Sequence, residues 1–497
     1  MYDIEKLRRV FPDTTIYKDK ATTAIFRAAK IDSFLRDWII KRKAGPDGRI
    51  EDTEKLARYI AKTIPNTSQK MALEDEARTK GETRSFLAKV NVEFRSRENY
   101  YSFEIPDLGF RHTETIIEDY VWERVKDQLI HEAGGWGMVK LGYAYPDENK
   151  KNGRFTLLEY KNFRPYQVNL DAYRAARAHY DVEEWTDVLL GAIDYDPDGF
   201  RVNDSDHESW LWKHTLLTRL LPFVQPRVNM IELAKQQTGK SYVFGKIGKY
   251  GWLSGGGKIT RAKLFTSMVQ GAKPNGLVTF NDFVAIDEVK SINFGDDLEM
   301  SGILKGYMED GSVKVGNTKV EGEAGIIFLG NIDPDDMGGT KDMFKELPDI
   351  FRDSALLQRI HGIIPAQYTH AISPSMIIND WALNSEYFTE IMHMMRSREE
   401  TMRYSAFVED LVEVRAESDL SHREKEAVFR LCTAYLKLFF PHVDEKMTRD
   451  MRFLEEFDKY CLRPAVAMQE TVLNQMKIIN PNEFKDKAMA SYRVKVR

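Results

Sequence analysis

The chain has 497 residues, of which 42% are hydrophobic and 30% are charged. This length exceeds what one hydrophobic core usually serves, so we expect three or four domains. The composition is that of a globular protein and excludes global disorder. The net charge of −5 excludes a general basic excess, so any surface for nucleic acid has to be local.

The cysteines and the apolar runs indicate the cellular compartment of the protein. Cys432 and Cys461 are the two cysteines, and they form no CxxC pair. This spacing argues against a disulfide framework or a thiolate zinc site and suits a reducing compartment. The N-terminus lacks the apolar core of a signal peptide, and no run approaches the roughly 18 apolar residues of a spanning helix. We expect a cytoplasmic protein with no membrane partner.

The first eighty residues have helical spacing. Apolar residues recur every three or four positions between Ala24 and Trp38, which predicts an N-terminal helical domain over residues 1–80. From about residue 84 the period changes to two, which indicates short strands. The strand-like runs are 86–94, 100–103, 137–143 and 154–160.

These short aromatic strands predict a β-rich domain over residues 81–200. A basic turn with Arg95 and Arg97 separates the first two runs. Small barrels of the OB type commonly bind oligonucleotides, so we predict an OB-like barrel that is a candidate DNA-binding domain. The alternative, a solvated hairpin without a ligand, stays open.

The rest of the chain divides at about residue 370. Strands and helices alternate over residues 201–370, which predicts a parallel α/β sheet. Residues 371–497 return to helical spacing and predict a helical lid followed by C-terminal helices. The predicted fold class is α/β, with the helical and β-rich domains in front of this core.

A phosphate-binding loop stands at the start of the α/β region. The strand 228–233 runs into Thr238, Gly239, Lys240 and Ser241 and then into an apolar helix start. Strand, loop, GK[ST] and helix is the context that a Walker A motif needs. We expect the loop amides to bind the phosphates of ATP, Lys240 to reach the β and γ phosphates, and Ser241 to ligate Mg²⁺. Ala234 stands where the motif usually has its first glycine, so chance occurrence is the alternative for this motif alone.

Three further elements follow in the order of a motor ATPase. The strand 283–288 ends in Asp287, which is expected to hold Mg²⁺, and in Glu288, which is expected to polarise the attacking water. The strand 325–331 ends in Asn331, a candidate to orient that water. Beyond it, Arg359 is the preferred arginine to reach a neighbouring subunit's γ phosphate.

The role assigned to Arg359 has two alternatives. Arg352 is its rival, and either arginine could instead form a surface salt bridge. Four ordered elements at workable spacings nevertheless predict an ATP hydrolase with an AAA+ type P-loop core.

Several segments resemble the MCM-type replicative helicases. The run 250–260 with 262–265 is similar to the segment that follows Walker A in that group. Residues 308–316 resemble the entry into its presensor-1 hairpin. Residues 421–426 with 430–434 resemble its sensor 2 helix, and this resemblance implies that Arg423 is the sensor 2 residue.

A closer resemblance is to BrxL, the Lon-like family of BREX bacteriophage-defence systems, and it covers nearly the whole chain. It implies a prokaryotic cytoplasmic protein and a hexameric ring, with stacked rings as a variant. The ring would encircle double-stranded DNA, move along it or remodel it with ATP, and contact other BREX proteins. The segments that carry the resemblance are 6–12, 134–137, 163–165, 238–242, 284–289 and 356–362.

The C-terminus departs from the family pattern. Full-length relatives carry a Lon-type protease domain with a Ser-Lys dyad after the helical region. Here about sixteen residues follow Pro481, which is too short a tail for such a domain. We expect no peptidase activity from this chain, which is either a short family member or a shortened one.

A predicted hairpin over residues 311–321 supports a DNA substrate. In the pore of a ring its Lys314 and Lys319 could meet phosphates, and Lys258 after three glycines is a second pore candidate. The alternative is a solvated hairpin whose lysines blunt exposed edges. Two other functions stay open, a polypeptide-unfolding ATPase and a nucleotide-gated assembly scaffold.

Overall fold

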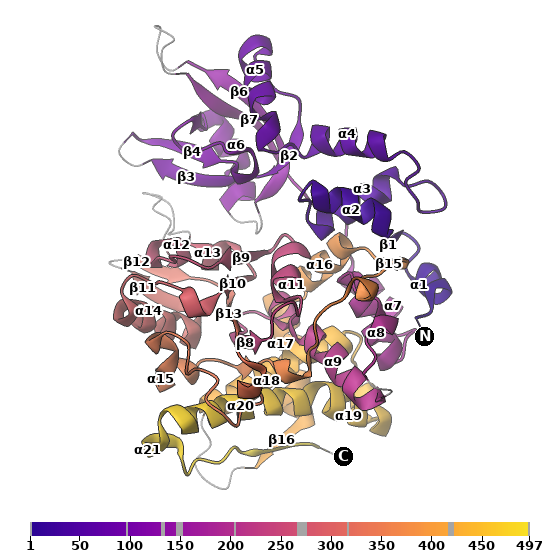
Figure 1. Cartoon of the computed structure of the whole chain (residues 1–497), viewed down its shortest axis with the longest axis vertical. Helices are drawn as coiled ribbons and strands as arrows, with labels where there is room; N and C mark the ends of the chain where they lie inside the picture. Colours follow the sequence, from indigo (N-terminus) through magenta and orange to yellow (C-terminus); the bar gives the residue numbers. More distant parts are fainter. Residues whose placement is uncertain are drawn as a thin grey trace.

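Figure 1 shows the computed structural model of the chain, with helices α2 to α5 and the β-rich part toward one end, the α/β part with the C-terminal helices toward the other, and α1 beside α7 and α8. The structure describes residues 2–95, 98–130, 135–145, 153–202, 205–265, 276–315, 318–415 and 422–495. Arg97, Gly134, Gly316, Asn317 and Ser421, which the sequence analysis used, lie outside the described residues.

Helices dominate residues 2–80, as predicted, but one short strand pairs this segment with residues 381–383. β1 (Thr15–Tyr17) pairs antiparallel with β15 (Trp381–Leu383). Aspartates accept hydrogen bonds from helix N-terminal amides before α1, α2 and α4, which explains where these helices begin. The helices are α1 (Ile4–Val10), α2 (Lys20–Ala28), α3 (Ser33–Lys43), α4 (Thr53–Thr63) and α5 (Lys70–Lys80).

The β-rich part has a four-stranded sheet of order β2-β6-β7-β5 and a hairpin β3-β4. An isolated bridge between Tyr101 and Ile117 joins the hairpin to the end of β5, and Val90 alone separates β2 from β3. Buried residues of these strands and of α6 (Asp119–Ile130) form one hydrophobic core. The strands are β2 (Phe86–Lys89), β3 (Asn91–Arg95), β4 (Tyr100–Glu104), β5 (Thr115–Ile116), β6 (Trp136–Ala144) and β7 (Arg154–Asn162).

The predicted parallel sheet is confirmed. Its order is β14-β8-β13-β10-β9, and every pairing is parallel. Alternate residues of β13 enter two different cores, since Ile327 and Leu329 pack on one face of the sheet and Ile326 and Phe328 on the other. The strands are β8 (Met230–Ala234), β9 (Gly251–Gly255), β10 (Phe283–Asp287), β13 (Gly325–Asn331) and β14 (Gly362–Ile363).

Among the described residues, five short helices and one longer one belong to the same α/β part. α10 comes just before β8, and the others lie between the strands or follow them. They are α10 (Leu221–Val224), α11 (Lys240–Lys246), α12 (Arg261–Phe265), α13 (Leu277–Phe280), α14 (Asp297–Asp310) and α15 (Ser354–Leu357).

The C-terminal helices share the largest core with helices that precede the sheet. Trp185 and Leu217 from the earlier helices and Leu431 and Phe457 from the later ones belong to one cluster. The helices are α7 (Leu170–Arg177), α8 (Val182–Ala192), α9 (Asp206–Thr218), α16 (Ser385–Met394), α17 (Arg398–Leu411), α18 (His422–Phe439), α19 (Met451–Phe457), α20 (Arg463–Ile479) and α21 (Pro481–Phe484).

The helical expectation for residues 371–497 missed three short strands. β15 pairs with β1, and β16 (Val412–Arg415) pairs antiparallel with β17 (Ser491–Val494). Each has only three or four residues, so its period is too short to stand out between long helices. Among the helices that the structure describes, none is both long and apolar enough to cross a bilayer.

Candidate functional site

The phosphate loop connects β8 to α11 and depends on left-handed backbone conformations. Gln237 has φ 62° and Gly239 has φ 80°. A Cβ on Gly239 would lie 2.3 Å from the hydroxyl of Tyr195. Gly239 is therefore required twice, by its backbone conformation and by the side chain packed against it.

Lys240 begins α11 and points to the end of the neighbouring strand. Its Nζ donates to Asn331 Oδ1 at 2.7 Å and to the carbonyl of Lys235 at 3.1 Å. Asn331 lies beside Ala234 because β13 pairs with β8. Burial lowers the pKa of Lys240. The structure thus brings together Lys240 and Asn331, which the sequence placed in one site.

Ser241 and Asp287 meet at the same edge of the sheet. The Ser241 hydroxyl donates to Asp287 Oδ2, while Asp287 Oδ1 accepts the amide N–H of Glu288 at 2.8 Å. A hydroxyl and a carboxylate oxygen are the hard ligands that Mg²⁺ takes together with phosphates and water. Within the described ranges, no group of three or more His, Cys, Asp or Glu side chains could hold a metal ion. One carboxylate and one hydroxyl fit Mg²⁺ that arrives with a nucleotide.

Glu288 has an unusual backbone and a glycine beside its carboxylate. Its φ is 54°, in the left-handed region. A Cβ added to Gly256 would lie 2.5 Å from Glu288 Oε2. Gly256 is the middle residue of the glycine triplet that precedes Lys258, and the pore role of Lys258 stays a prediction. A side chain at position 256 would displace that carboxylate.

Arg359 and Arg423 come together at the other edge of the sheet. Arg359 Nε lies 2.7 Å from Glu309 Oε2, and Arg423 Nη2 lies 2.9 Å from Glu309 Oε1. Arg423 Nη1 also donates to Gln358 Oε1 at 3.1 Å. Two arginines that the sequence assigned to separate elements thus share one carboxylate.

This arginine pair is far from the phosphate loop of the same chain. The carbonyl of Arg359 accepts a hydrogen bond from the side chain of Asn229, which immediately precedes β8. The phosphate loop follows the last residue of β8, and five residues at about 3.3 Å each put the two ends roughly 15 Å apart. The rival Arg352 pairs with Asp342 at 2.8 Å.

The DNA-binding candidates lie on separate elements. Lys314 in β11 (Ser312–Val315) stands opposite Lys319 in β12 (Thr318–Glu321), which confirms the predicted hairpin. Lys319 pairs with Glu321 at 2.5 Å. Arg95 Nη2 lies 3.6 Å from Glu98 Oε1. The backbones of Lys258 and Asn293 form an isolated parallel β-bridge. Their roles stay predictions, and Arg97 lies outside the described residues.

Sequence reasoning missed a buried ion pair behind the phosphate loop. Arg219 donates through Nε and Nη2 to both carboxylate oxygens of Glu232, and both side chains are fully buried. Arg219 Nη1 also donates to the carbonyl of Thr238 at 2.8 Å. Glu232 in an apolar strand was a signal, because a buried charge needs a partner. The partner, which directly follows the last residue of α9, could not be located without the fold.

Two family descriptions match this chain. The ATPase domain described as Lon-like protease BrxL-like matches residues 155–490, and the N-terminal domain of the BREX system Lon protease-like protein BrxL matches residues 9–143. Lon-like protease BrxL of Escherichia coli O9:H4 (strain HS) is 26% identical over 492 residues, which cover 98% of this chain. That of Bacillus cereus (strain H3081.97) is 28% identical over 404 residues, or 80% of this chain. The matched regions span 66% and 55% of the lengths of these relatives. The chain belongs to the BrxL family and contains the family's ATPase domain.

Proposed function

We propose that this chain is a ring-forming AAA+ ATPase that hydrolyses ATP with Mg²⁺ and acts on double-stranded DNA in BREX defence against bacteriophage. The observation that carries the proposal is the convergence of Lys240, Ser241, Asp287 and Asn331 at the carboxyl edge of one parallel sheet. Numbered in chain order, the five strands of that sheet are arranged 5-1-4-3-2. Ligands of such sheets bind outside the carboxyl ends of the strands.

The chain's own residues divide the chemistry between them. Lys240 exchanges Asn331 Oδ1 and the Lys235 carbonyl for phosphate oxygens. Ser241 and Asp287 would hold Mg²⁺, and the bound ion would neutralise charge that develops on the phosphates. Glu288 accepts a hydrogen bond from the attacking water and polarises it, and Asn331, once released by Lys240, orients that water.

The arginine pair supports a site that two subunits share. Arg359 and Arg423 are at the amino edge of their own sheet, so they stabilise transition-state charge in a neighbouring subunit rather than in their own. Glu309 holds both arginines until the neighbour's γ phosphate competes for them. Closure of this head-to-tail contact gives a ring, and the family suggests six subunits.

Two features support DNA as the substrate. The lysines at positions 314 and 319 stand side by side on one hairpin and can grip phosphates without reading sequence. The strand order of the β-rich part supports an OB-like barrel, because β3, β4, β5, β7, β6 and β2 follow each other through pairings and one bridge. Since Val90 alone lies between β2 and β3, the last strand of this order is joined directly to the first.

The test is ATP turnover by the full chain with duplex DNA, single-stranded DNA or an unfolded protein added. We expect duplex DNA to stimulate turnover and to bind with a strong salt dependence. The double variant Lys314→Gln, Lys319→Gln should lose stimulation, while the exposed pair Lys485→Gln, Lys487→Gln serves as the charge-matched control. Stimulation by the unfolded protein alone would favour the polypeptide-unfolding alternative. Turnover that no polymer changes would favour a nucleotide-gated scaffold.

A further inference from the structure

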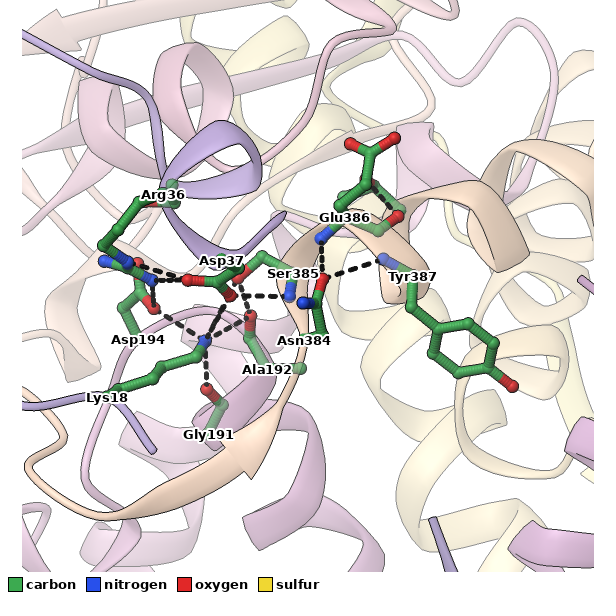
Figure 2. Close-up of polar contacts among 12 residues, drawn as sticks. Lys18, Arg36, Asp37, Gly191, Ala192, Asp194, Asn384, Ser385, Glu386 and Tyr387 are labelled. Carbon is green, nitrogen blue, oxygen red and sulfur yellow. Dashed lines mark hydrogen bonds and ion pairs between the residues drawn. The ribbon is translucent and has the colours of Figure 1, made fainter. Parts of the chain in front are cut away.

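A network of four charged side chains is buried between the N-terminal segment and the ATPase domain. Lys18 Nζ lies 2.7 Å from Asp194 Oδ1 and 3.2 Å from Asp37 Oδ2, and Arg36 Nη2 lies 2.5 Å from both Asp37 Oδ1 and Asp194 Oδ1. None of the four side chains is more than 5% exposed. Figure 2 shows these side chains pointing toward one another from different elements.

Backbone groups complete the network. Lys18 Nζ also donates to the carbonyls of Gly191 and Ala192 at the end of α8, at 3.0 and 3.3 Å (Figure 2). Asp37 Oδ2 accepts the amide N–H of Ser385 at the start of α16. Removing charges from water is costly, and buried ion pairs often give little net stability. A role beyond stability is therefore worth seeking for this network.

The network continues into the nucleotide site through Tyr242. This residue directly follows Ser241, the proposed Mg²⁺ ligand, and its hydroxyl donates to Asp194 Oδ2 at 2.5 Å. The same hydroxyl lies 2.8 Å from Ser33 Oγ, the first residue of α3. Asp194 has φ 73°, a conformation that aspartate adopts more readily than most residues.

Asp194 also places its neighbour against the phosphate loop. The next residue is Tyr195, whose hydroxyl lies where a side chain on Gly239 would have to go. Residues 194 and 195 thus contact the first turn of α11 through Tyr242 and the loop itself through Gly239. The two contacts fix the start of α11 relative to the buried network.

We propose that Asp194 and Tyr242 are positioning residues, which set the place of Ser241 and couple the nucleotide site to α3. The inference rests on the proposed ATP hydrolysis at this site and adds a connection between that site and the N-terminal segment. α11 has only seven residues, so a shift of its first turn moves Ser241 directly. Ser33, Arg36 and Asp37 all belong to α3, so the same shift reaches this helix.

The charge state of Asp194 suits a fixed anchor. Burial acts to raise the pKa of its carboxyl, but the charges of Arg36 and Lys18 outweigh burial and hold that pKa well below its usual range. Asp194 therefore remains an acceptor for the Tyr242 hydroxyl at neutral pH. Burial, and then the charge of Asp194, raise the pKa of Tyr242, which keeps its hydroxyl a donor.

The first experiment is Tyr242→Phe in the full chain, which removes one hydroxyl and leaves the four charges paired. We expect turnover to fall about tenfold and the Mg²⁺ concentration for half-maximal turnover to rise about threefold. Tyr250→Phe is the matched control, because Tyr250 donates to the buried carboxylate of Glu390 at 2.6 Å and belongs to no part of the site. It should lower thermal stability without changing the Mg²⁺ dependence.

The second experiment tests the connection to α3. Ser33→Ala should lower turnover about twofold in the wild type and have no further effect in Tyr242→Phe, because both variants break the same contact. Hydrogen exchange of α3 amides should slow when the wild type binds a non-hydrolysable ATP analogue with Mg²⁺. In Tyr242→Phe the phosphate loop should still be protected while α3 is not.

The outcomes separate this inference from the proposed function. A wild type without ATP turnover refutes the proposed function itself. A wild type that hydrolyses ATP refutes the inference if Tyr242→Phe keeps the same turnover and Mg²⁺ dependence. If Tyr242→Phe does not fold, the turnover of Ser33→Ala and the hydrogen exchange of the wild type test the inference instead. Unchanged exchange of the α3 amides on nucleotide binding overturns the coupling.

Discussion

The two edges of the parallel sheet carry different kinds of polar site. At the carboxyl edge, Lys240 bonds to Asn331 and Ser241 bonds to Asp287, so complementary groups already face each other. At the amino edge, Arg359 and Arg423 share the single carboxylate of Glu309. One edge is a nearly complete site, and the other presents more positive than negative charge.

This difference is the reason for proposing that two subunits share the reaction. A nucleotide bound at the carboxyl edge brings excess negative charge, and the amino edge of a neighbour offers excess positive charge. Head-to-tail contact pairs the two edges, whereas a symmetric dimer through one edge would leave the other unpaired. Each variant below alters one edge and leaves the other unchanged.

The largest effects are expected at the carboxyl edge. Lys240→Ala should reduce ATP hydrolysis below detection, because it removes the cation that binds the β and γ phosphates. Glu288→Gln should still bind ATP while losing hydrolysis, since an amide cannot polarise the water as a carboxylate does. Steady-state turnover and binding of a fluorescent ATP analogue measure the two steps. Undiminished hydrolysis by Glu288→Gln would contradict its proposed role.

The amino edge should matter only between subunits. Arg359→Ala is expected to lower turnover by roughly 10³-fold, the scale of an arginine that acts from a neighbour. Arg352→Ala is the matched control, because its arginine already pairs with Asp342 within the chain. Mixed rings of Arg359→Ala and Lys240→Ala should regain part of the turnover, since some interfaces then combine an intact site with an intact arginine. No recovery at any ratio, with rings intact, would argue against action between subunits.

The carboxyl edge was the predictable one. Hydrophobic strands that end in polar residues mark the carboxyl ends of parallel strands, so the amino-acid pattern by itself groups Lys240, Asp287 and Asn331. The amino edge was not predictable to the same degree. Arg359 is in the turn after α15 and Arg423 is in α18, and Glu309 carries no motif that would name it as their common partner.

In the N-terminal half, local strands were also predictable, whereas a pairing between strands distant in the sequence was not. The alternation of residues 86–94 predicted strands there, and β2 and β3 confirm them. The pairing of β1 with β15 could not be predicted, because its two strands have three residues each and are separated by most of the chain. Long-range pairing leaves no local period in the sequence.

A smaller effect is expected from the buried pair behind the phosphate loop. Arg219→Met or Glu232→Leu alone should destabilise the fold by about 3 to 5 kcal/mol, because each leaves a buried charge without its partner. The double variant should recover most of that stability but lack the bond from Arg219 to the Thr238 carbonyl. We expect its KM for ATP to rise about tenfold with a smaller change in kcat. Urea unfolding and steady-state kinetics separate the two effects, and a wild-type KM in the double variant would make the pair purely structural.

The smallest effect concerns acid stability at the amino edge, where His361 is buried two residues after Arg359. Its Nδ1 accepts the amide N–H of Asn229 at 2.9 Å, which only a neutral ring can do. Burial, followed by the charges of Arg430 and Arg227, lowers the pKa of His361 well below its usual value. The unfolded chain therefore binds a proton more readily than the folded chain.

The sign of the pH effect follows from that difference. The contribution of neutral His361 is fully present above the unfolded pKa of about 6.5 and is lost as the pH falls below it, by up to about 1.4 kcal/mol for each pH unit. His361→Asn places a carbonyl oxygen near the position of Nδ1 and does not titrate. Urea unfolding between pH 7.5 and 5 should therefore lose less stability in His361→Asn than in the wild type, whose other histidines are unchanged. Parallel losses in the two proteins would mean that His361 is protonated in the folded chain as readily as in the unfolded one.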